Sequence, residues 1–226
     1  MLMAVFCLGA SLIGINAQEK DWANLQRYAQ QNAELPKPDK NEKRVVFMGN
    51  SITEGWVNTH PDFFKSNGYI GRGIGGQTSY QFLVRFREDV INLSPALVVI
   101  NAATNDIAEN TGAYHEDRTF GNIVSMVELA KANHIKVILT TTLPAAAFGW
   151  NPSIKDAPQK IASLNARLKA YAQTNKIPFV DYYSSMVSGS NKALNPAYTK
   201  DVVHPTSEGY DVMENLIQQA INKTLR

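Results

Sequence analysis

Short apolar runs alternate with longer amphipathic stretches along most of the chain. The apolar runs predict strands at 44–48, 96–101, 136–141 and 177–181, with a fifth short strand near 69–70. The stretches between them predict helices at 79–91, 119–133, 158–175 and 207–225, which are long enough to connect parallel strands. Strands that are apolar throughout are expected when helices cover both faces of a sheet. The pattern therefore predicts the α/β class: a three-layer α/β/α sandwich around a central, mostly parallel five-stranded sheet.

The first 17 residues follow a different pattern. They carry no charge, and an apolar run from Leu2 to Ile15 ends where the sequence turns polar at Gln18. A run of about 14 residues is short for a hydrocarbon core of about 30 Å. We interpret residues 1–17 as a secretory signal peptide cleaved after Ala17, which predicts a secreted or periplasmic protein without a stable membrane anchor. A buried N-terminal helix and a transmembrane anchor are the alternatives, and Cys7 has too little apolar sequence before it for a lipidation site.

The rest of the chain divides into an N-terminal helix and proline-bearing linker at 18–43 and one domain at 44–226.

Composition narrows the classes of function that this chain can have. With 22 Lys and Arg against 20 Asp and Glu, the formal net charge is +2, which argues against a general electrostatic grip on nucleic acid or acidic membranes. Four histidines and one cysteine form no zinc-binding pattern. We expect no metal and no cofactor.

Polar residues that can support chemistry follow several predicted strands, where ligands bind in open α/β sheets. Ser51 follows the first strand after a glycine, so its hydroxyl can lie at the head of a helix. The alternative is a helix cap, since Glu54 three residues later completes a capping-box pattern. Thr53 replaces the last glycine of Gly-x-Ser-x-Gly, which disfavours an α/β-hydrolase nucleophile elbow.

Two further segments can donate hydrogen bonds. Gly71, Gly73 and Gly76 match Gly-x-Gly-x-x-Gly, but they do not follow the first strong strand, and the next strand ends in Asn101 rather than in a ribose-binding carboxylate. We therefore expect a tight turn whose N–H groups bind an anion or an oxyanion, and not a dinucleotide site. Asn105, after a strand, can offer its amide to the same crevice, or it can be an ordinary turn residue.

The last polar segment holds an acid and a base. Asp201 and His204 are separated by two residues just before the last helix, so one loop can deliver an imidazole and the carboxylate that orients it. The other histidines, at positions 60, 115 and 134, lie in loops or near a helix end, and we interpret them as structural or solvated.

Taken in order, these segments resemble the SGNH (GDSL-type) hydrolase family over residues 44–210. The matching residues are Gly49, Ser51, Ile52, Thr53, Gly76, Asn105, Asp106, Asp201, His204 and Pro205. Asn50 stands where the family usually has Asp, and Ala103 where it usually has Gly. The glycine segment is most similar to the acetylhydrolase branch that includes platelet-activating-factor acetylhydrolase, which favours Gly76 over Gly75 as the oxyanion glycine.

The resemblance implies a flavodoxin-like fold and a serine esterase without a cofactor. Ser51 is then the nucleophile, His204 the base and Asp201 its orienting group, while the N–H groups of Ser51 and Gly76 and the amide of Asn105 form the oxyanion hole.

The substrate expectation combines export with the acetylhydrolase-like block. Both favour short acyl esters, most of all O-acetyl groups on carbohydrates. Trp56 and Trp150 are candidate substrate-binding residues, and Tyr69, Tyr80 and Phe148 can join them, unless these aromatic residues belong to the core. A lysophospholipase or thioesterase acting on lipids is the main alternative, and a non-catalytic glycan-binding module is the other. The partner expected is a small-molecule or glycan ester.

Overall fold

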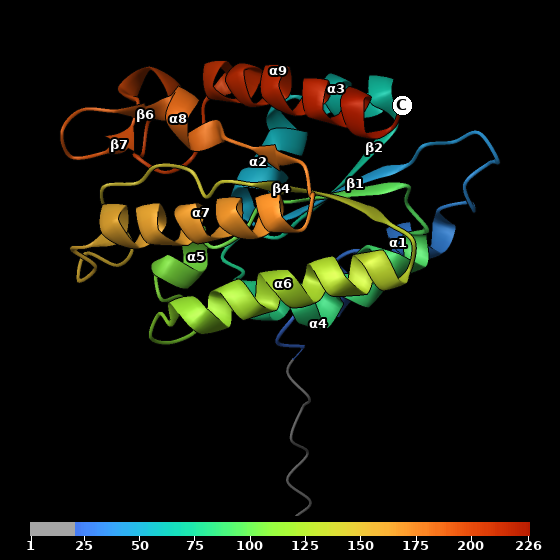
Figure 1. Cartoon of the computed structure of the whole chain (residues 1–226), viewed down its shortest axis with the longest axis horizontal. Coiled ribbons are helices and arrows are strands. Elements are labelled where there is room, and N and C mark those ends of the chain that lie inside the picture. Colours follow the sequence, from blue (N-terminus) through green and yellow to red (C-terminus); the bar gives the residue numbers. More distant parts are fainter. Residues whose placement is uncertain (1–20) are drawn as a thin grey trace, which may run out of the picture.

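The computed structural model describes residues 21–226 and has a five-stranded sheet at its centre. All its strands are parallel, in the order β2-β1-β3-β4-β5. The strands are β1 (Val45–Gly49), β2 (Tyr69–Gly73), β3 (Leu97–Ile100), β4 (Lys136–Thr140) and β5 (Phe179–Val180). The predicted fold class and all five predicted strands are confirmed (Figure 1).

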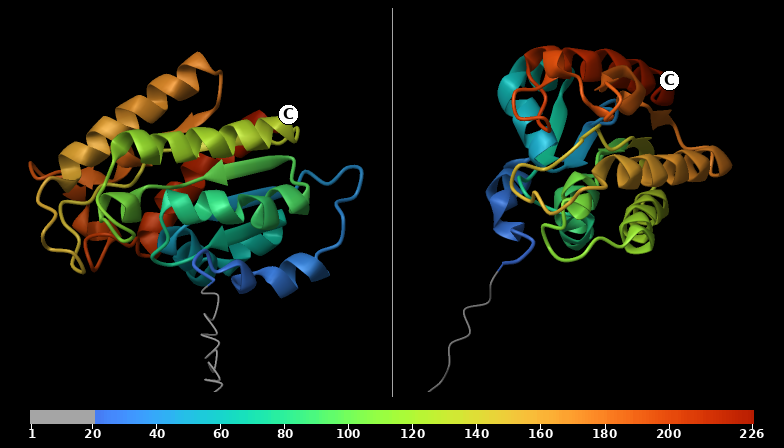
Figure 2. Two further views of the ribbon diagram at one scale, coloured as in Figure 1. Left: turned by 90° about the horizontal axis from the view of Figure 1, so that it is seen from below. Right: turned by 90° about the vertical axis from the view of Figure 1, so that its left-hand side faces the viewer.

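Helices cover both faces of this sheet (Figures 1 and 2). On one face lie α2 (Ser51–Thr59), α3 (Pro61–Asn67), α8 (Tyr182–Met186) and α9 (Ser207–Thr224). On the other lie α4 (Ser79–Asp89), α6 (Glu116–Ala132) and α7 (Ala157–Thr174). The shorter elements are α1 (Ala29–Glu34), α5 (Thr104–Ile107), three 3₁₀ turns (Leu25–Arg27, Ile91–Leu93 and Pro196–Tyr198) and a hairpin of β6 (Val187–Ser188) and β7 (Ala193–Leu194).

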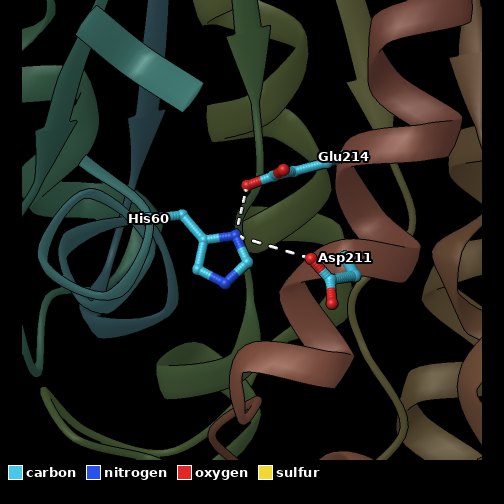
Figure 3. A group of neighbouring side chains, drawn as sticks. All are labelled: His60, Asp211 and Glu214. Carbon is cyan, nitrogen blue, oxygen red and sulfur yellow. Dashed lines mark hydrogen bonds and ion pairs between the residues drawn. The ribbon is translucent and has the colours of Figure 1, made fainter. Parts of the chain in front are cut away.

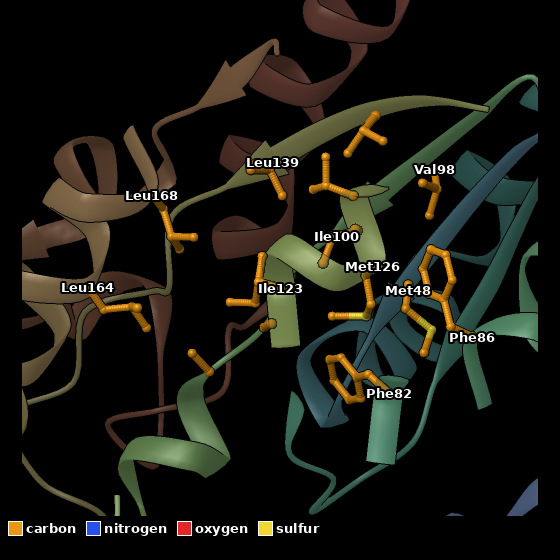
Figure 4. Close-up of a cluster of buried hydrophobic side chains, with 14 of the residues drawn as sticks. Met48, Phe82, Phe86, Val98, Ile100, Ile123, Met126, Leu139, Leu164 and Leu168 are labelled. Atoms are coloured by element: carbon orange, nitrogen blue, oxygen red, sulfur yellow. The ribbon is translucent and has the colours of Figure 1, made fainter. Parts of the chain in front are cut away.

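Alternation along the strands sends side chains into two separate cores. Val45 and Phe47 of β1 pack with α2, α3 and α9, whereas Val46 and Met48 pack with α4 and α6. Figure 4 shows the second core, where Phe82 and Phe86 of α4 approach Met48. All five residues of β1 are buried, as expected for a strand in the middle of a parallel sheet. Because helices pack on both faces of the sheet, the strands are held firmly, and the loops of the candidate site begin at their C-terminal ends.

The N-terminal segment differs from its expected single helix. Asn24 has left-handed backbone angles (φ 54°), and the chain forms a 3₁₀ turn followed by the short α1. Asn32 of α1 donates to the carboxylate of Asp89 on α4 at 2.7 Å, so the segment packs on the domain. The predicted signal peptide lies outside the described residues. Between residues 21 and 226, no helix combines the length and the apolar character needed to cross a membrane.

Candidate active site

Ser51 occupies the first position of α2, directly beyond the end of β1. Asn50 is the N-cap, and its side-chain oxygen accepts the N–H of Ile52 at 3.0 Å. Glycine is required at position 49, since a Cβ there would lie 2.0 Å from Oγ1 of Thr53. The first N–H groups of a helix have no intrahelical acceptor, so the N–H of Ser51 points outward unpaired by the helix. The hydroxyl and a backbone donor therefore lie at one helix start.

The three predicted catalytic side chains form one continuous hydrogen-bonded line. Oγ of Ser51 lies 2.8 Å from Nε2 of His204, and Nδ1 of the same ring lies 2.6 Å from Oδ2 of Asp201. An ionised carboxylate only accepts, so Nδ1 donates to it and Nε2 is left to accept from the hydroxyl. This is the arrangement that a serine nucleophile and its base require.

A strained loop holds the acid and the base together. Val202, a β-branched residue, has φ 69°, a conformation that costs on the order of 1–3 kcal/mol. In this loop Oδ1 of Asp201 accepts the N–H groups of Val203 at 3.0 Å and His204 at 2.7 Å. Burial raises the pKa of the Asp201 carboxyl, but the backbone and ring donors of His204 outweigh it and hold this pKa at about 2. The carboxylate is therefore ionised throughout the neutral range.

The glycine turn after β2 presents one unpaired N–H. The N–H of Gly75 is taken by Oε2 of Glu54 at 2.9 Å, and Gly76, at φ 76°, uses the conformational freedom of glycine. Its carbonyl accepts from Asn110 at 3.0 Å, while its N–H has no acceptor within residues 21–226. The geometry thus agrees with the choice of Gly76 over Gly75. Glu54 does not cap Ser51: the capping-box alternative is wrong because this carboxylate binds Gly75 and Arg27 instead.

Asn105 lies in α5, just after β3, and is almost fully buried. Its Nδ2 donates to the carbonyl of Gln77, the residue after Gly76, at 2.9 Å, which leaves a second amide hydrogen available to a ligand. The neighbouring Asp106 accepts from the N–H of Ser79 at 2.9 Å and from Thr119 at 3.2 Å. Burial raises the pKa of Asp106, against the lowering effect of these donors. Asp106 thus fixes α5 on two other helices.

Ala103 takes a positive φ of 84° at the start of α5. A left-handed alanine costs roughly 1–2 kcal/mol, which explains the usual glycine of the family at this position. The turn nevertheless has the shape that places Asn105, so the departure from the family pattern leaves the architecture intact.

The two candidate substrate tryptophans have different surroundings. Trp56 is only 2% exposed, stacks between Phe63 and Tyr210 and donates to Glu214 at 2.9 Å. The prediction that it binds substrate is wrong, because a side chain enclosed by the core cannot touch a ligand. Trp150 is 47% exposed, and its ring centroid lies 6.3 Å from that of His204.

A cavity of about 620 Å³ adjoins Trp150 and Gly76. It is lined by Asp21, Trp22, Gly75, Gly76, Gln77, Gln81, Ala108, Glu109, Asn110, Thr111, Trp150 and Asn151. Gly76 brings one candidate oxyanion donor to its wall, and Trp150 brings the side chain beside the base. The lining is polar except for the two tryptophans and Ala108, so it is suited to a ligand rich in hydroxyl groups.

A second polar cluster joins the C-terminal end of α2 to α9. His60, Asp211 and Glu214 have potential ligand atoms within 4.8 Å of one another and are the described side chains best placed to hold a metal ion (Figure 3). Nδ1 of His60 lies 2.6 Å from Glu214, and its Nε2 lies 2.7 Å from Oγ of Ser207. These contacts support the structural interpretation of His60.

Comparison with known proteins agrees with this geometry. Residues 47–212 match the model of the GDSL-like lipase/acylhydrolase family. The chain belongs to this family. A crystal structure of a GDSL-like lipase from Bacteroides thetaiotaomicron is 77% identical, covers 89% of this chain and 98% of its own, and superposes with a TM-score of 0.89. The GDSL acylhydrolase is thus an ester-hydrolysing enzyme, as predicted.

Other proteins are similar to this chain at lower sequence identity. An uncharacterized lipoprotein of Bacillus subtilis is 32% identical over 117 residues, which are 44% of this chain and 48% of that protein, so the chain spans about half the length of this curated relative. A Streptococcus protein named for platelet-activating factor is 18% identical (TM-score 0.72, 87% of this chain, 90% of that one). An acetyl xylan esterase is 23% identical (TM-score 0.62, 78% and 98%). The last two share the fold.

Replacing Asn105 tests its place in the oxyanion hole. We expect Asn105→Ala to lower kcat on p-nitrophenyl acetate by about 10²–10³-fold, the usual cost of one lost oxyanion donor. The loss of its hydrogen bond to Gln77 lowers the unfolding free energy by only about 1–3 kcal/mol. Asn122→Ala is the matched control, since it also removes one side-chain hydrogen bond, to Ser79. Equal kcat in the two variants would exclude Asn105 from the oxyanion hole.

The dependence of activity on pH tests whether Asp201 stays ionised in the working range of the enzyme. The pKa of Asp201 is depressed to about 2, so the stabilisation that its ionised form gives is complete above its ordinary value of 3.8 and is lost as the pH falls through about 2. Asp201 therefore stays ionised between pH 8 and about 4, and we expect this carboxylate to contribute no proton to the pH dependence of kcat/KM in that range. A two-proton slope would show that Asp201 titrates in the same range.

Proposed function

We propose that this GDSL acylhydrolase removes short acyl groups, chiefly acetyl, from O-acetylated carbohydrates. The observation that carries the proposal is the hydrogen-bonded line of Ser51, His204 and Asp201 beside a polar cavity. A long acyl chain needs an apolar path, and the lining offers Ala108 as its one aliphatic side chain. The polar amides of the same lining match the hydroxyl groups of a sugar.

The geometry supports a two-step reaction. His204 takes the proton of Ser51 as Oγ bonds to the ester carbonyl carbon, and the carbonyl electron pair moves to the oxygen. The N–H groups of Ser51 and Gly76 and the amide of Asn105 stabilise that oxyanion. Its collapse breaks the bond to the alcohol, which leaves with the proton held by His204.

The second step repeats the first with water. His204 takes a proton from water, whose oxygen attacks the acyl-enzyme carbonyl, and returns the proton to Oγ as the carboxylic acid leaves. Throughout both steps the carboxylate of Asp201 holds the ring by its Nδ1 hydrogen and stabilises the imidazolium.

A series of p-nitrophenyl esters tests the acyl preference. We expect kcat/KM to fall from acetate through butyrate to octanoate, since the cavity that Gly76 and Trp150 line has little aliphatic surface for a longer chain. Acetate release from an O-acetylated xylo-oligosaccharide then tests the carbohydrate. Preference for octanoate would replace this proposal by a lipid acylhydrolase, and no turnover of any ester would favour a binding module.

Export of the chain is part of the proposal. It is supported by the uncharged apolar run of residues 1–17 and the polar sequence after it. N-terminal sequencing of protein recovered outside the cytoplasm should begin at Gln18, and a start before Ala17 would contradict cleavage at this site.

A further inference from the structure

The described N-terminal segment is hydrogen-bonded to the loop between β2 and α4 (residues 74–78), which carries Gly76 and is here called the oxyanion loop, and to the first turn of α4. The carbonyl of Ala23 accepts from Nε2 of Gln77 at 2.7 Å, and the carbonyl of Trp22 accepts from Nε2 of Gln81 at 2.8 Å. Gln77 directly follows the glycine that presents the unpaired N–H. The N-terminal segment therefore lies against the candidate active site, next to Gly76.

Two more contacts fix the same segment to the elements behind the site. Arg27 pairs at 2.9 Å with Glu54, whose second oxygen holds the N–H of Gly75. The hydroxyl of Tyr28 donates to the carbonyl of Gly73 at the end of β2. Figure 2 shows the blue segment lying along the edge of the sheet formed by β2. These contacts use backbone atoms, Arg27 and Tyr28, and none of them uses the indole of Trp22.

The indole of Trp22 is instead left open at the cavity. It is 48% exposed, almost the same as Trp150 at 47%, and both line the cavity that reaches Gly76. The segment is held in place by other groups, so about half of the Trp22 side chain stays in contact with water and contributes little to packing. Its position is explained if a ligand with an apolar face covers it.

Trp150 is held in place from the other side. Its Nε1 donates to Oδ1 of Asn110 at 2.8 Å, and Nδ2 of this asparagine donates to the carbonyl of Gly76 at 3.0 Å. The same amide thus fixes both an exposed indole and the oxyanion glycine. Trp150 also contacts Phe148, at 5.3 Å between ring centroids, which leaves its outer surface for the cavity.

The chemistry of the lining indicates the class of ligand. A pyranose ring has an apolar C–H face, which packs on aromatic rings, and a rim of hydroxyl groups, which hydrogen-bond to amides and carboxylates. The cavity offers two indoles together with the polar side chains of Gln81, Glu109 and Thr111. A fatty acyl chain has no hydroxyl groups with which these polar side chains could form further hydrogen bonds.

We propose that Trp22 and Trp150 are specificity-determining residues that bind the sugar rings of an O-acetylated oligosaccharide, with the N-terminal segment forming one wall of the subsite. This inference rests on the proposed carbohydrate esterase function. It adds a residue outside the predicted domain at 44–226 to the site and predicts that the enzyme prefers an oligomer to a small ester because of that residue.

The test compares two substrates in each variant. We expect Trp22→Ala and Trp150→Ala each to lower the ratio of kcat/KM on O-acetylated xylotriose to kcat/KM on p-nitrophenyl acetate by roughly 3- to 10-fold, the effect of one lost aromatic stacking contact. Trp22→Phe, which keeps a stacking ring, retains most of the ratio. Val84→Ala is the control, since Val84 is 52% exposed but does not line the cavity.

Binding without turnover gives an independent readout. In the Ser51→Ala background, calorimetry with O-acetylated xylotriose should show Kd rising by a similar factor when Trp22→Ala is added. An unchanged ratio and Kd, or the same loss in Trp22→Phe as in Trp22→Ala, would overturn the inference while the esterase function stands. A wild-type enzyme that turns over p-nitrophenyl acetate but not O-acetylated xylotriose would instead refute the carbohydrate proposal, and this inference with it.

Discussion

Ser51→Ala is expected to lower kcat on p-nitrophenyl acetate by roughly four orders of magnitude or more, because it removes the atom that forms the acyl-enzyme. The hydroxyl of Ser51 contacts His204 alone among the described side chains, so its loss leaves no buried acceptor or donor without a partner. Alanine is also a good helix residue at the start of α2. The variant should therefore unfold at the same midpoint as the wild type.

Ser66→Ala is the control for this substitution. Ser66 lies on α3, is exposed and has no side-chain hydrogen bond within residues 21–226. Its kcat should equal that of the wild type. A Ser51→Ala enzyme that keeps a kcat within about tenfold of wild type would show that another group is the nucleophile.

Arg85→Met is expected to cause the largest loss of stability, about 3–5 kcal/mol, because it breaks a buried ion pair. Arg85 is fully buried on α4, and its guanidinium binds Asp89 at 2.8 Å, the carbonyl of Gly49 at 2.9 Å and Oε1 of Gln77 at 2.6 Å. Burial lowers the pKa of Arg85, and the hydrogen bond with Asp89 acts against it. One side chain thus ties the end of β1 to the oxyanion loop.

Chemical denaturation and kinetics together measure this effect. A loss of this size lowers Tm by roughly 10 °C in a domain of this length, and kcat should fall as well because Gln77 loses its anchor. Arg87→Met, on the exposed face of the same helix, should change neither quantity. Adding Asp89→Leu to Arg85→Met should recover part of the stability, since the unpaired buried carboxylate is then gone. A single variant as stable as Arg87→Met would contradict this role.

The sheet and its long helices were predictable because burial on two faces leaves a plain signal in the sequence. The runs that form β1 and β3 are apolar throughout, β4 is apolar between Lys136 and Thr140, and the ends of all three differ from the prediction by one residue or so. The helices α2 and α3 were not predicted as elements. They are short, α2 contains Gly55, and α3 begins at a proline directly after the α2 C-cap, so neither shows a full helical period.

The side chains of the hydrogen-bonded line, Ser51, His204 and Asp201, could also be singled out from the sequence, since their types and order are distinctive. The partners that position them could not. Glu54 fits a local capping box in the sequence, yet a backbone donor on another loop and Arg27 bind it in the fold. Arg85 is a charged residue on an amphipathic helix, which ordinarily indicates a solvent-exposed position. Its burial depends on acceptors from three separate segments, and no sequence window contains them all.

The tryptophans show the same limit. Trp56 is close to Ser51 in sequence, but the helical rotation of α2 turns it toward α9, where Glu214 accepts its N–H. Trp22 is far from every motif and reaches the cavity only because the N-terminal segment folds back on the oxyanion loop. Closeness to a motif along the chain therefore wrongly favoured Trp56 as a ligand contact and gave no sign of Trp22.

Acid-quench mass spectrometry identifies the residue that carries the acyl group during turnover. Enzyme mixed with p-nitrophenyl acetate is quenched during turnover, digested and mapped for the mass increase of one acetyl group. We predict the acetyl group on the peptide that carries Ser51, and its disappearance from that peptide in Ser51→Ala. Acetylation of a different residue during turnover, with Ser51 unmodified, would contradict the role of Ser51 as the nucleophile.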